Sequence, residues 1–222
     1  RPSATIHLES FPEIDAGLQD DDLNQRWQTI LKIRSDVTRT LATGSRTAIL
    51  GPNGSGKSTL LQVIGGALVP TAGSIVHRLN GRDLPQEEVY RHVSIAAPYL
   101  GLYEDLSLRE VLDFHARFKP LRTGLAPADV ARIAYLEKAL EKPVLHFSSG
   151  MKQRLKLALA ILSDTPLLLL DEPSSNLDAE AIAWFRALLR DHVDGRTLVI
   201  ASNRQPAEHD LCTGHIEIAD FK

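Results

Sequence analysis

The sequence predicts an α/β fold in which a mostly parallel β-sheet is flanked by helices. Residues 47–50 read as a short buried strand, and the glycine-rich loop after them leads directly into a helix over 60–64. Residues 167–170 form a continuous leucine run that ends in an acid, which is typical of a central strand buried on both faces. Residues 197–201 form another such apolar run. Because stretches with helical spacing separate these strands, we expect a parallel sheet covered by helices.

The bulk composition indicates one domain with a substantial core. The chain has 222 residues, of which 43% are hydrophobic. It carries 25 basic and 28 acidic residues, a net charge of −3, which gives no support to a nucleic-acid partner. No apolar run approaches the about 20 residues of a membrane span. The single cysteine, Cys212, cannot form an internal disulfide, which suits a reducing compartment.

Strands are expected in the first third of the chain. Residues 5–8 alternate weakly and are interpreted as a strand. Partial alternation over 27–41 predicts further strands before a turn at 43–45. Residues 70–73 are expected to form a turn, and the strand of residues 74–77 to follow it.

The middle of the chain changes to helical spacing. Ser107 and Glu110 fit a capping box that opens a first helix. The apolar spacing predicts a second helix over 128–140 and a third that runs from about 148 to 162. These three helices imply a second lobe inserted into the sheet-based core. A further helix is expected over 179–189.

The glycine-rich loop fits the phosphate-binding pattern G-x-x-x-x-G-K-[ST]. The candidate nucleotide-binding residues are Gly51, Pro52, Asn53, Gly54, Ser55, Gly56, Lys57, Ser58 and Thr59. Glycines let the backbone N–H groups point inward, as an anion nest at a helix N-terminus. In this pattern the lysine reaches the β- and γ-phosphates and the Ser58 hydroxyl ligates Mg²⁺. A flexible glycine turn is the less favoured alternative, because a strand and a helix flank the loop on the correct sides.

Two acids at the end of the leucine run form the second candidate site. Ligands bind at the carboxyl ends of parallel strands. There Asp171 can hold Mg²⁺, and Glu172 can orient and deprotonate a water that attacks the γ-phosphate. Taken alone, the pair could equally begin an ordinary loop. The phosphate loop upstream favours the catalytic interpretation.

With these motifs the chain resembles the ATP-binding subunits of ABC transporters over nearly all of its length. Residues 147–151 read Phe-Ser-Ser-Gly-Met and are similar to the family's signature motif, usually Leu-Ser-Gly-Gly-Gln. Ser148, Ser149 and Gly150 open a helix, so their N–H groups can bind an anion. The resemblance identifies that anion as the γ-phosphate held by another subunit. An isolated helix cap is the alternative.

Residues 175–178 resemble the family's D-loop, which ends at Asp178. The resemblance implies a single ABC ATPase domain. Its P-loop NTPase core and N-terminal antiparallel β lobe would occupy about 1–97 and 163–222, with an inserted helical lobe at about 98–162. ATP and Mg²⁺ are the implied cofactors.

The resemblance also implies partners. Two ATPase subunits, identical or related, would sandwich two ATP molecules head to tail on the cytoplasmic face of a membrane. An integral membrane permease would dock against residues 99–106, although these side chains could instead be core of the lobe. No nucleic acid is expected.

Three further positions bear on the activity that the resemblance implies. Pro98 stands where the family has a glutamine, and it offers neither a side-chain oxygen nor an N–H. Asn203 stands where the family has its switch histidine; its amide can donate to a phosphate oxygen but cannot shuttle a proton. Trp27 lies about where the family stacks the adenine, with lobe core as the alternative. With Lys57, Glu172 and Asn203 as catalytic residues, slower or differently gated hydrolysis is expected.

The leading hypothesis is an ATP-hydrolysing subunit that powers a membrane ABC transporter through ATP-driven closure of a dimer. One rival is a non-transport ABC ATPase that acts on nucleic acid or ribosomes, which the lack of a basic excess opposes. The other rival is a nucleotide-dependent switch with little hydrolysis. Pro98 and Asn203 favour the switch, and Glu172 opposes it.

Overall fold

The fold is built around a five-stranded parallel sheet. The computed structural model describes residues 4–9, 39–70 and 74–221. The sheet has the strand order β6-β7-β8-β3-β9, and every pair in it is parallel. Its strands are β3 (Arg46–Leu50), β6 (Val93–Ala96), β7 (Leu167–Asp171), β8 (Thr197–Ser202) and β9 (Gly214–Glu217). The predicted parallel sheet is confirmed, with the three predicted strands at its centre.

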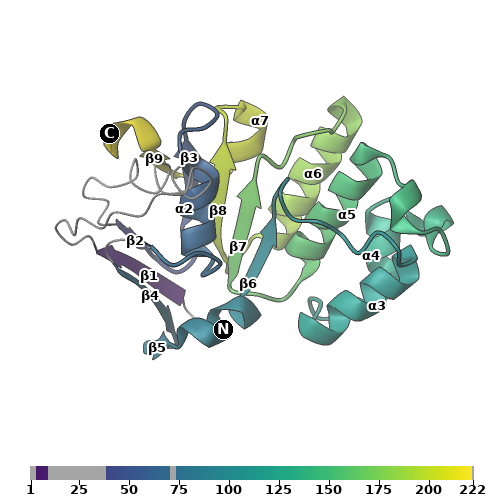
Figure 1. The fold of residues 1–222 in the computed structure, drawn as a ribbon, viewed down its shortest axis with the longest axis horizontal. Helices are drawn as coiled ribbons and strands as arrows, with labels where there is room; N and C mark the ends of the chain where they lie inside the picture. Colours follow the sequence, from purple (N-terminus) through teal and green to yellow (C-terminus); the bar gives the residue numbers. More distant parts are fainter. Residues whose placement is uncertain (1–3, 10–38, 71–73, 222) are drawn as a thin grey trace, which may run out of the picture.

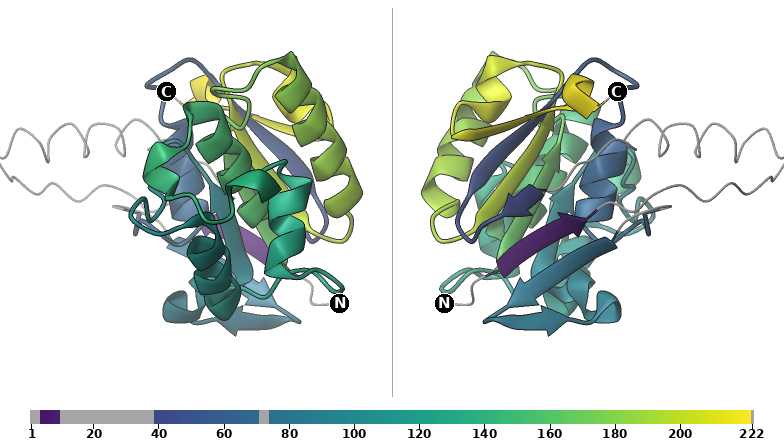
Figure 2. Two further views of the ribbon diagram at one scale, coloured as in Figure 1. Left: turned by 90° about the vertical axis from the view of Figure 1, so that its right-hand side faces the viewer. Right: turned by 90° about the vertical axis from the view of Figure 1, so that its left-hand side faces the viewer.

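A four-stranded antiparallel sheet lies beside the parallel sheet, on the side away from the larger helices (Figures 1 and 2). It has the order β2-β1-β4-β5, formed by β1 (Ala4–Glu9), β2 (Arg39–Leu41), β4 (Ser74–Leu79) and β5 (Arg82–Leu84). This confirms the strands expected at 5–8 and 74–77. Most of the predicted 27–41 region and of the turn at 70–73 lies outside the described residues.

Helices cover both faces of the parallel sheet. Helix α2 (Lys57–Ile64) packs on one face, and α5 (Ser149–Leu162) and α6 (Ala179–His192) pack on the other. Successive strand residues point to opposite faces, so Leu167 and Leu169 join the core around α2, whereas Leu168 and Leu170 join the core around α5 and α6. All five residues of β7 are buried. The leucines of β7 therefore pack into the hydrophobic cores on both faces of the sheet.

The helices α3 (Leu108–Phe118), α4 (Pro127–Ile133) and α5 form a group at one end of the molecule (Figure 1). The predicted capping box is present, since the Ser107 side chain accepts from the Glu110 N–H and the Glu110 carboxylate accepts from the Ser107 N–H. Helix α7 (Pro206–His209) follows β8. Short 3₁₀ helices occupy Gln86–His92, Glu137–Ala139, Val144–His146 and Ile218–Phe221.

The helix predicted over 128–140 is wrong in its second half. Helix α4 ends at Ile133, and Tyr135 adopts a left-handed φ of 57°, which a helix cannot contain. Leu136 is nevertheless buried in the core. The apolar spacing therefore marked core residues on a turn as well as on a helix.

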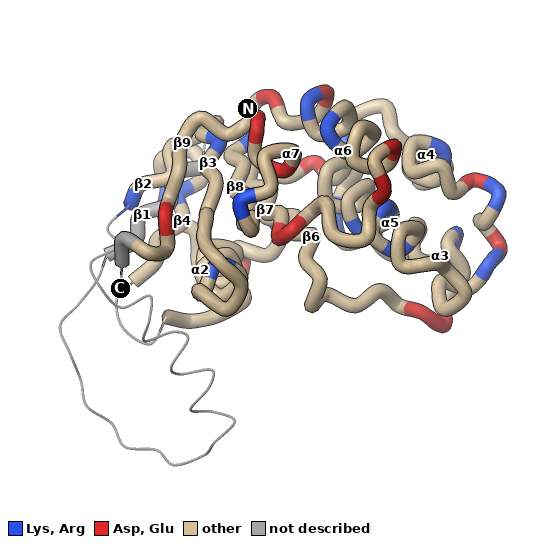
Figure 3. Tube along the Cα trace, turned by 90° about the horizontal axis from the view of Figure 1, so that it is seen from above, with Lys and Arg blue, Asp and Glu red and all other residues tan. Residues whose placement is uncertain are grey.

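Charge is spread over the helical end of the molecule. Figure 3 shows basic and acidic residues interspersed along α3 to α6. Among the described residues, we find no helix with the length and apolar character that crossing a bilayer requires.

Candidate functional site

The phosphate loop joins β3 to α2 at the carboxyl end of the parallel sheet. Gly54 and Gly56 have left-handed φ values of 72° and 105°, which glycine adopts without a steric cost. A Cβ added at Gly54 would meet nothing within 4 Å, so the backbone conformation, and not crowding, calls for glycine there. Gly56 is the N-cap of α2 and supplies no side-chain cap. The first N–H groups of α2 therefore stay available to an anion.

The loop encloses a pocket of about 160 Å³. Its lining consists of Asn53, Gly54, Gly56, Lys57, Ser58, Thr59 and Glu172. The two motifs found in the sequence, the phosphate loop and the acid after β7, thus share one pocket.

The other loop residues shape this pocket. The Ser55 N–H donates to the Pro52 carbonyl at 3.2 Å. A Cβ added at Gly51 would lie 2.7 Å from the Ser55 hydroxyl oxygen, so a larger residue there would require the Ser55 side chain to move. The Ser55 hydroxyl is buried and has no hydrogen-bond partner among the described residues.

Lys57 is held inside the loop. Its side chain is 4% exposed, and its Nζ donates to the Pro52 carbonyl at 3.1 Å. The same Nζ lies 4.0 Å from Glu172 Oε1. The ammonium group is therefore positioned between the loop and the acid, where a phosphate oxygen could replace the carbonyl as its acceptor.

Asp171 ends β7 as a buried carboxylate. The residue is 1% exposed, and neither carboxylate oxygen has a hydrogen-bond partner in the described part of the chain. Burial raises the pKa of Asp171 above its usual value; the Ser58 side chain and the Lys57 charge oppose this, whereas the charges of Glu172 and Glu208 add to it. A buried carboxylate without a partner is costly, and carboxylate and hydroxyl oxygens are the donors that Mg²⁺ prefers. Asp171 and Ser58 thus fit a magnesium ion.

Glu172 follows β7 directly and begins the next loop. Its φ is 43°, an unusual value for a residue other than glycine. Its N–H donates to the Ala201 carbonyl at 2.9 Å, which fixes its backbone to β8. Gln153 of α5 donates its side-chain N–H to the Pro173 carbonyl at 3.0 Å, which also holds this loop. The Glu172 side chain lines the phosphate pocket and stays partly exposed.

The segment that resembles the signature opens α5. The Ser148 hydroxyl accepts from the Met151 N–H at 3.2 Å, as an N-cap does. Ser148 and Ser149 are exposed, and neither they nor Gly150 line the phosphate pocket of their own chain. A Cβ added at Gly150 would lie 3.3 Å from the Asn176 carbonyl. The segment resembling the signature therefore packs closely against the segment resembling the D-loop.

Three further positions, Asp178, Asn203 and Pro98, do not line the pocket. Asp178 is the N-cap of α6, where its side chain accepts from the Ala181 N–H at 2.8 Å. Asn203, just after β8, and Pro98, just after β6, are both exposed. Neither lines the pocket. Trp27 lies outside the described residues.

A neighbouring residue that the sequence reading did not assign to the site is Tyr99. Burial and the Asp171 charge raise the pKa of the Tyr99 hydroxyl, and a hydrogen bond with the Gln62 side chain opposes the shift. The segment before it is held from α5, since Lys156 Nζ donates to the Ala97 and Pro98 carbonyls at 3.4 and 3.5 Å. The sequence analysis placed Tyr99 only in the docking segment 99–106, because the strand before it, β6, was not predicted.

Comparison with known proteins gives a consistent result. The family described as ABC transporter matches residues 35–175. An "Uncharacterized ABC transporter ATP-binding protein YcbN" from Bacillus subtilis is 34% identical over 78% of this chain, which spans 57% of that protein. The "Cytochrome c biogenesis ATP-binding export protein CcmA" of Rhizobium meliloti is 33% identical over 78% of this chain and 84% of its own length.

A solved structure described as "Structure of ATP binding subunit of ABC transporter" superposes with a TM-score of 0.72 at 26% identity, covering 96% of this chain and 85% of that one. A putative ABC transporter ATP-binding protein from Pyrococcus furiosus has the same fold, with a TM-score of 0.71 at 19% identity, over 98% and 99% of the two chains.

Proposed function

The chain belongs to the ABC transporter family as an ATP-binding subunit, and we propose that it hydrolyses ATP with Lys57, Asp171 and Glu172 to power a membrane permease. The family couples ATP hydrolysis to transport. The observation that carries the proposal is the shared pocket, in which Lys57 Nζ lies 4.0 Å from the Glu172 carboxylate beside the buried acid Asp171.

The residues divide the chemistry between them. The N–H groups at the start of α2 and the Lys57 ammonium hold the phosphates and neutralise the charge that develops during transfer. The Glu172 carboxylate orients a water and accepts its proton. Ser58 and Asp171 would hold Mg²⁺, which would supply neutralisation of the phosphate charge.

A turnover assay tests the function. Purified protein, with its partner proteins present, is expected to release phosphate from ATP in a magnesium-dependent manner. The matched variants Lys57→Ala and Glu172→Gln supply the background rate. Wild-type release no greater than that of both variants would refute the proposal.

The Asp171→Asn variant should separate metal binding from stability. Asparagine keeps the shape of the side chain and loses its charge. Removing even an indirect partner of a metal ligand costs about 10- to 100-fold in affinity, so the half-saturating Mg²⁺ concentration for hydrolysis should rise at least tenfold. Because the pKa of Asp171 is raised in the folded protein, its ionised form destabilises the fold above the unfolded pKa. The melting temperature of the ligand-free variant at neutral pH should therefore equal or exceed that of wild type.

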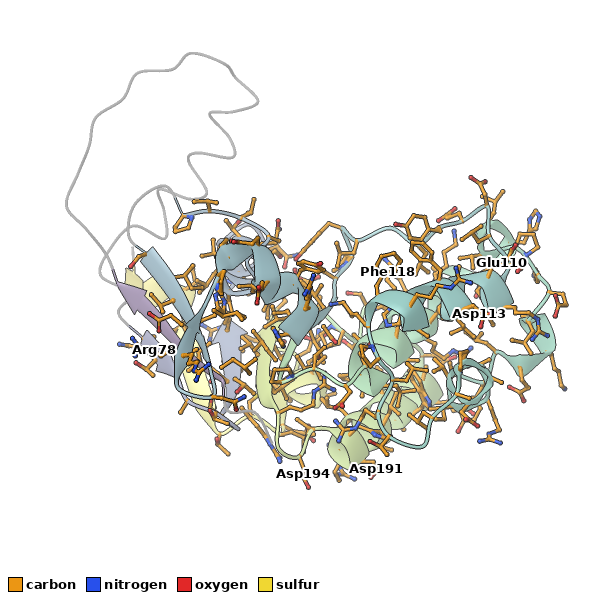
Figure 4. The ribbon with its side chains drawn as sticks, turned by 90° about the horizontal axis from the view of Figure 1, so that it is seen from below. Arg78, Glu110, Asp113, Phe118, Asp191 and Asp194 are labelled. Carbon is orange, nitrogen blue, oxygen red and sulfur yellow. The ribbon has the colours of Figure 1, made fainter. Side chains whose placement is uncertain are left out.

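The control for this prediction is Asp113→Asn, an exposed acid on α3 (Figure 4). Asp113→Asn should change neither the half-saturating Mg²⁺ concentration nor the melting temperature. An unchanged magnesium requirement in Asp171→Asn would contradict the assignment of Asp171 as a metal ligand.

We propose a head-to-tail dimer, with the same or a related subunit as partner. Ser148, Ser149 and Gly150 lie at the N-terminus of the 14-residue helix α5 and do not line the pocket of their own chain. An exposed helix N-terminus attracts anions, so the three residues suit the γ-phosphate held by a second subunit. Asp178 and Trp27 remain proposed nucleotide-binding residues, Trp27 as the one that stacks on the adenine.

The proposed docking surface for the permease includes an apolar groove. The groove has a volume of about 290 Å³ and lies between the segment 94–103 and the helices α3 and α5. Tyr103, Phe114 and Phe118 extend it as a row of rings, with centroids 5.0 and 4.8 Å apart. The exposed fractions of Tyr103 and Phe118 are 60% and 61%, and Figure 4 shows Phe118 on α3. Exposed aromatic rings beside a groove suit a helix with an apolar face.

Tyr103→Glu is expected to abolish transport without abolishing ATP hydrolysis. A charge placed on the apolar row should abolish permease-driven transport in reconstituted vesicles and leave the ATPase rate of the isolated subunit within about twofold, because surface substitutions change stability little. Tyr135→Glu, an exposed tyrosine after α4, is the matched control and should preserve transport. Normal transport by Tyr103→Glu would place the docking surface elsewhere.

The nucleotide switch stays as a second candidate, because the exposed position of Asn203 outside the pocket favours weak sensing of the γ-phosphate. Dimer lifetime separates the two functions. A hydrolysing subunit should form an ATP dimer that dissociates as phosphate is released, whereas a switch should form one that persists in wild type.

A further inference from the structure

A buried carboxylate outside the phosphate pocket connects the two loops that carry the proposed catalytic residues. Glu208 of α7 is 3% exposed. Its Oε1 accepts from the backbone N–H of Ser174 at 3.0 Å and from the Ser174 hydroxyl at 2.5 Å. Its Oε2 accepts from the Ser202 hydroxyl at 2.5 Å.

The two serines connect the Glu208 carboxylate to the loop that carries Glu172 and to the end of β8. Ser174 comes two residues after Glu172, and Ser202 directly precedes Asn203. The two serines follow or end the neighbouring strands β7 and β8, whose register pairs Asp171 with Ala201. Beyond this pair the Glu172 N–H donates to the Ala201 carbonyl. Glu208 thus joins the loop after β7 to the end of β8, next to the last residue pair of these two strands.

Because Glu208 is buried, its hydrogen bonds favour one arrangement of the segments that it joins. A carboxylate out of water is stable only when its oxygens accept hydrogen bonds. One Glu208 oxygen accepts from the loop after β7, and the other accepts from the last residue of β8. If that loop moves away from β8, an oxygen loses its donor in a site with little access to water. The arrangement therefore favours one position of the loop relative to the end of β8.

A second side chain also holds the loop after Glu172. Gln153 donates to the Pro173 carbonyl, and Pro173 lies between Glu172 and Ser174. Residues 173 and 174 are therefore hydrogen-bonded both to α5, through Gln153, and to α7, through Glu208.

We propose that Glu208 is a positioning residue for ATP hydrolysis, which fixes the loop after Glu172 to the end of β8 and so holds the Glu172 carboxylate at the phosphate pocket. This inference rests on the proposed role of Glu172. Glu208 acts through Ser174 and Ser202 and does not touch the nucleotide.

The test compares Glu208→Ala with Glu208→Gln. Misplacement of a catalytic group by about 1 Å can cost about 100-fold, so the alanine variant should lose about 10- to 100-fold in kcat while the KM for ATP changes less than threefold. In the glutamine variant the amide oxygen can still accept from Ser174, and the amide N–H can donate to the Ser202 hydroxyl. Glu208→Gln should therefore recover most of the wild-type kcat.

Further variants establish the pathway. Ser174→Ala should lower kcat on its own and cause no additional loss in the Glu208→Ala background, because residues of one network are not additive. Glu87→Ala removes an exposed carboxylate from the 3₁₀ helix at 86–92 and should have no effect. If the separate losses in kcat of Ser174→Ala and Glu208→Ala multiply in the double variant, the proposal is overturned.

Hydrogen exchange provides a readout that does not depend on hydrolysis. The amide of Ser174 should exchange faster in Glu208→Ala than in wild type, and exchange in β7 should not change. If wild type releases no phosphate, the proposed function fails and the exchange result still tests the connection. The inference is overturned if Glu208→Ala folds and shows both the kcat and the Ser174 amide exchange of wild type. If Glu208→Ala does not fold, the same two results in Ser174→Ala would overturn it.

Discussion

Replacing Glu172 by glutamine should reduce phosphate release from Mg-ATP by about 100- to 10,000-fold, the range that a general base contributes. Glutamine has nearly the same shape, so the left-handed backbone at this residue and the N–H bond to Ala201 should persist. It cannot accept a proton from the attacking water. Steady-state phosphate release, measured with saturating ATP and Mg²⁺, gives the loss.

ATP binding should remain intact in the same variant. Lys57 keeps its contact with the Pro52 carbonyl, and losing the acid 4.0 Å away makes the pocket more favourable to a phosphate. Equilibrium binding of ATP should therefore be equal or tighter. Glu180→Gln, an exposed residue on α6, is the matched control. A release rate in Glu172→Gln above one tenth of wild type would assign the base to another residue.

Replacing Lys57 by alanine should remove most ATP binding. A hydrogen bond with a charged group is worth about 1.5–3 kcal/mol, so the Kd for ATP should rise by about 10- to 150-fold. The buried Lys57 ammonium lines the phosphate pocket, and alanine leaves the phosphate charge without it. Calorimetric titration with ATP and Mg²⁺ measures the change.

The melting temperature in the absence of nucleotide distinguishes a binding loss from unfolding. The loop is closed by the Ser55–Pro52 backbone bond and by Gly51, which the Lys57→Ala variant leaves in place. The apo protein should therefore melt near the wild-type temperature. Lys138→Ala, which removes an exposed lysine from the helical end, should bind ATP normally. Unchanged ATP affinity in Lys57→Ala would remove the lysine from the site.

The central strands could be predicted from the sequence because burial on both faces leaves an unmistakable composition. In β7 every residue must be apolar until the chain reaches the ligand edge, and the acid at 171 marks that edge. Strand β6 carries Ser94, whose hydroxyl is paired with Thr165 in the interior, so it lacks a continuous apolar run. It was therefore not visible to the same reasoning.

The site could be predicted where its residues are close in sequence, and not where they meet only in the fold. The phosphate loop is one continuous segment, and the strand and helix that flank it identified it as a phosphate-binding loop. Glu208 is separated from Ser174 by 34 residues, and a glutamate in a short polar stretch gave no sign of burial. The end of α4 failed for a related reason, because the core also accepts Leu136 from a turn.

Lys156 of α5 donates to the carbonyls of residues 97 and 98, directly after β6. The same chain continues into residues 100–103, which line the apolar groove. One short segment thus connects the groove to the carboxyl end of β6. If α5 moves away from that end of the sheet, the two hydrogen bonds from Lys156 must break.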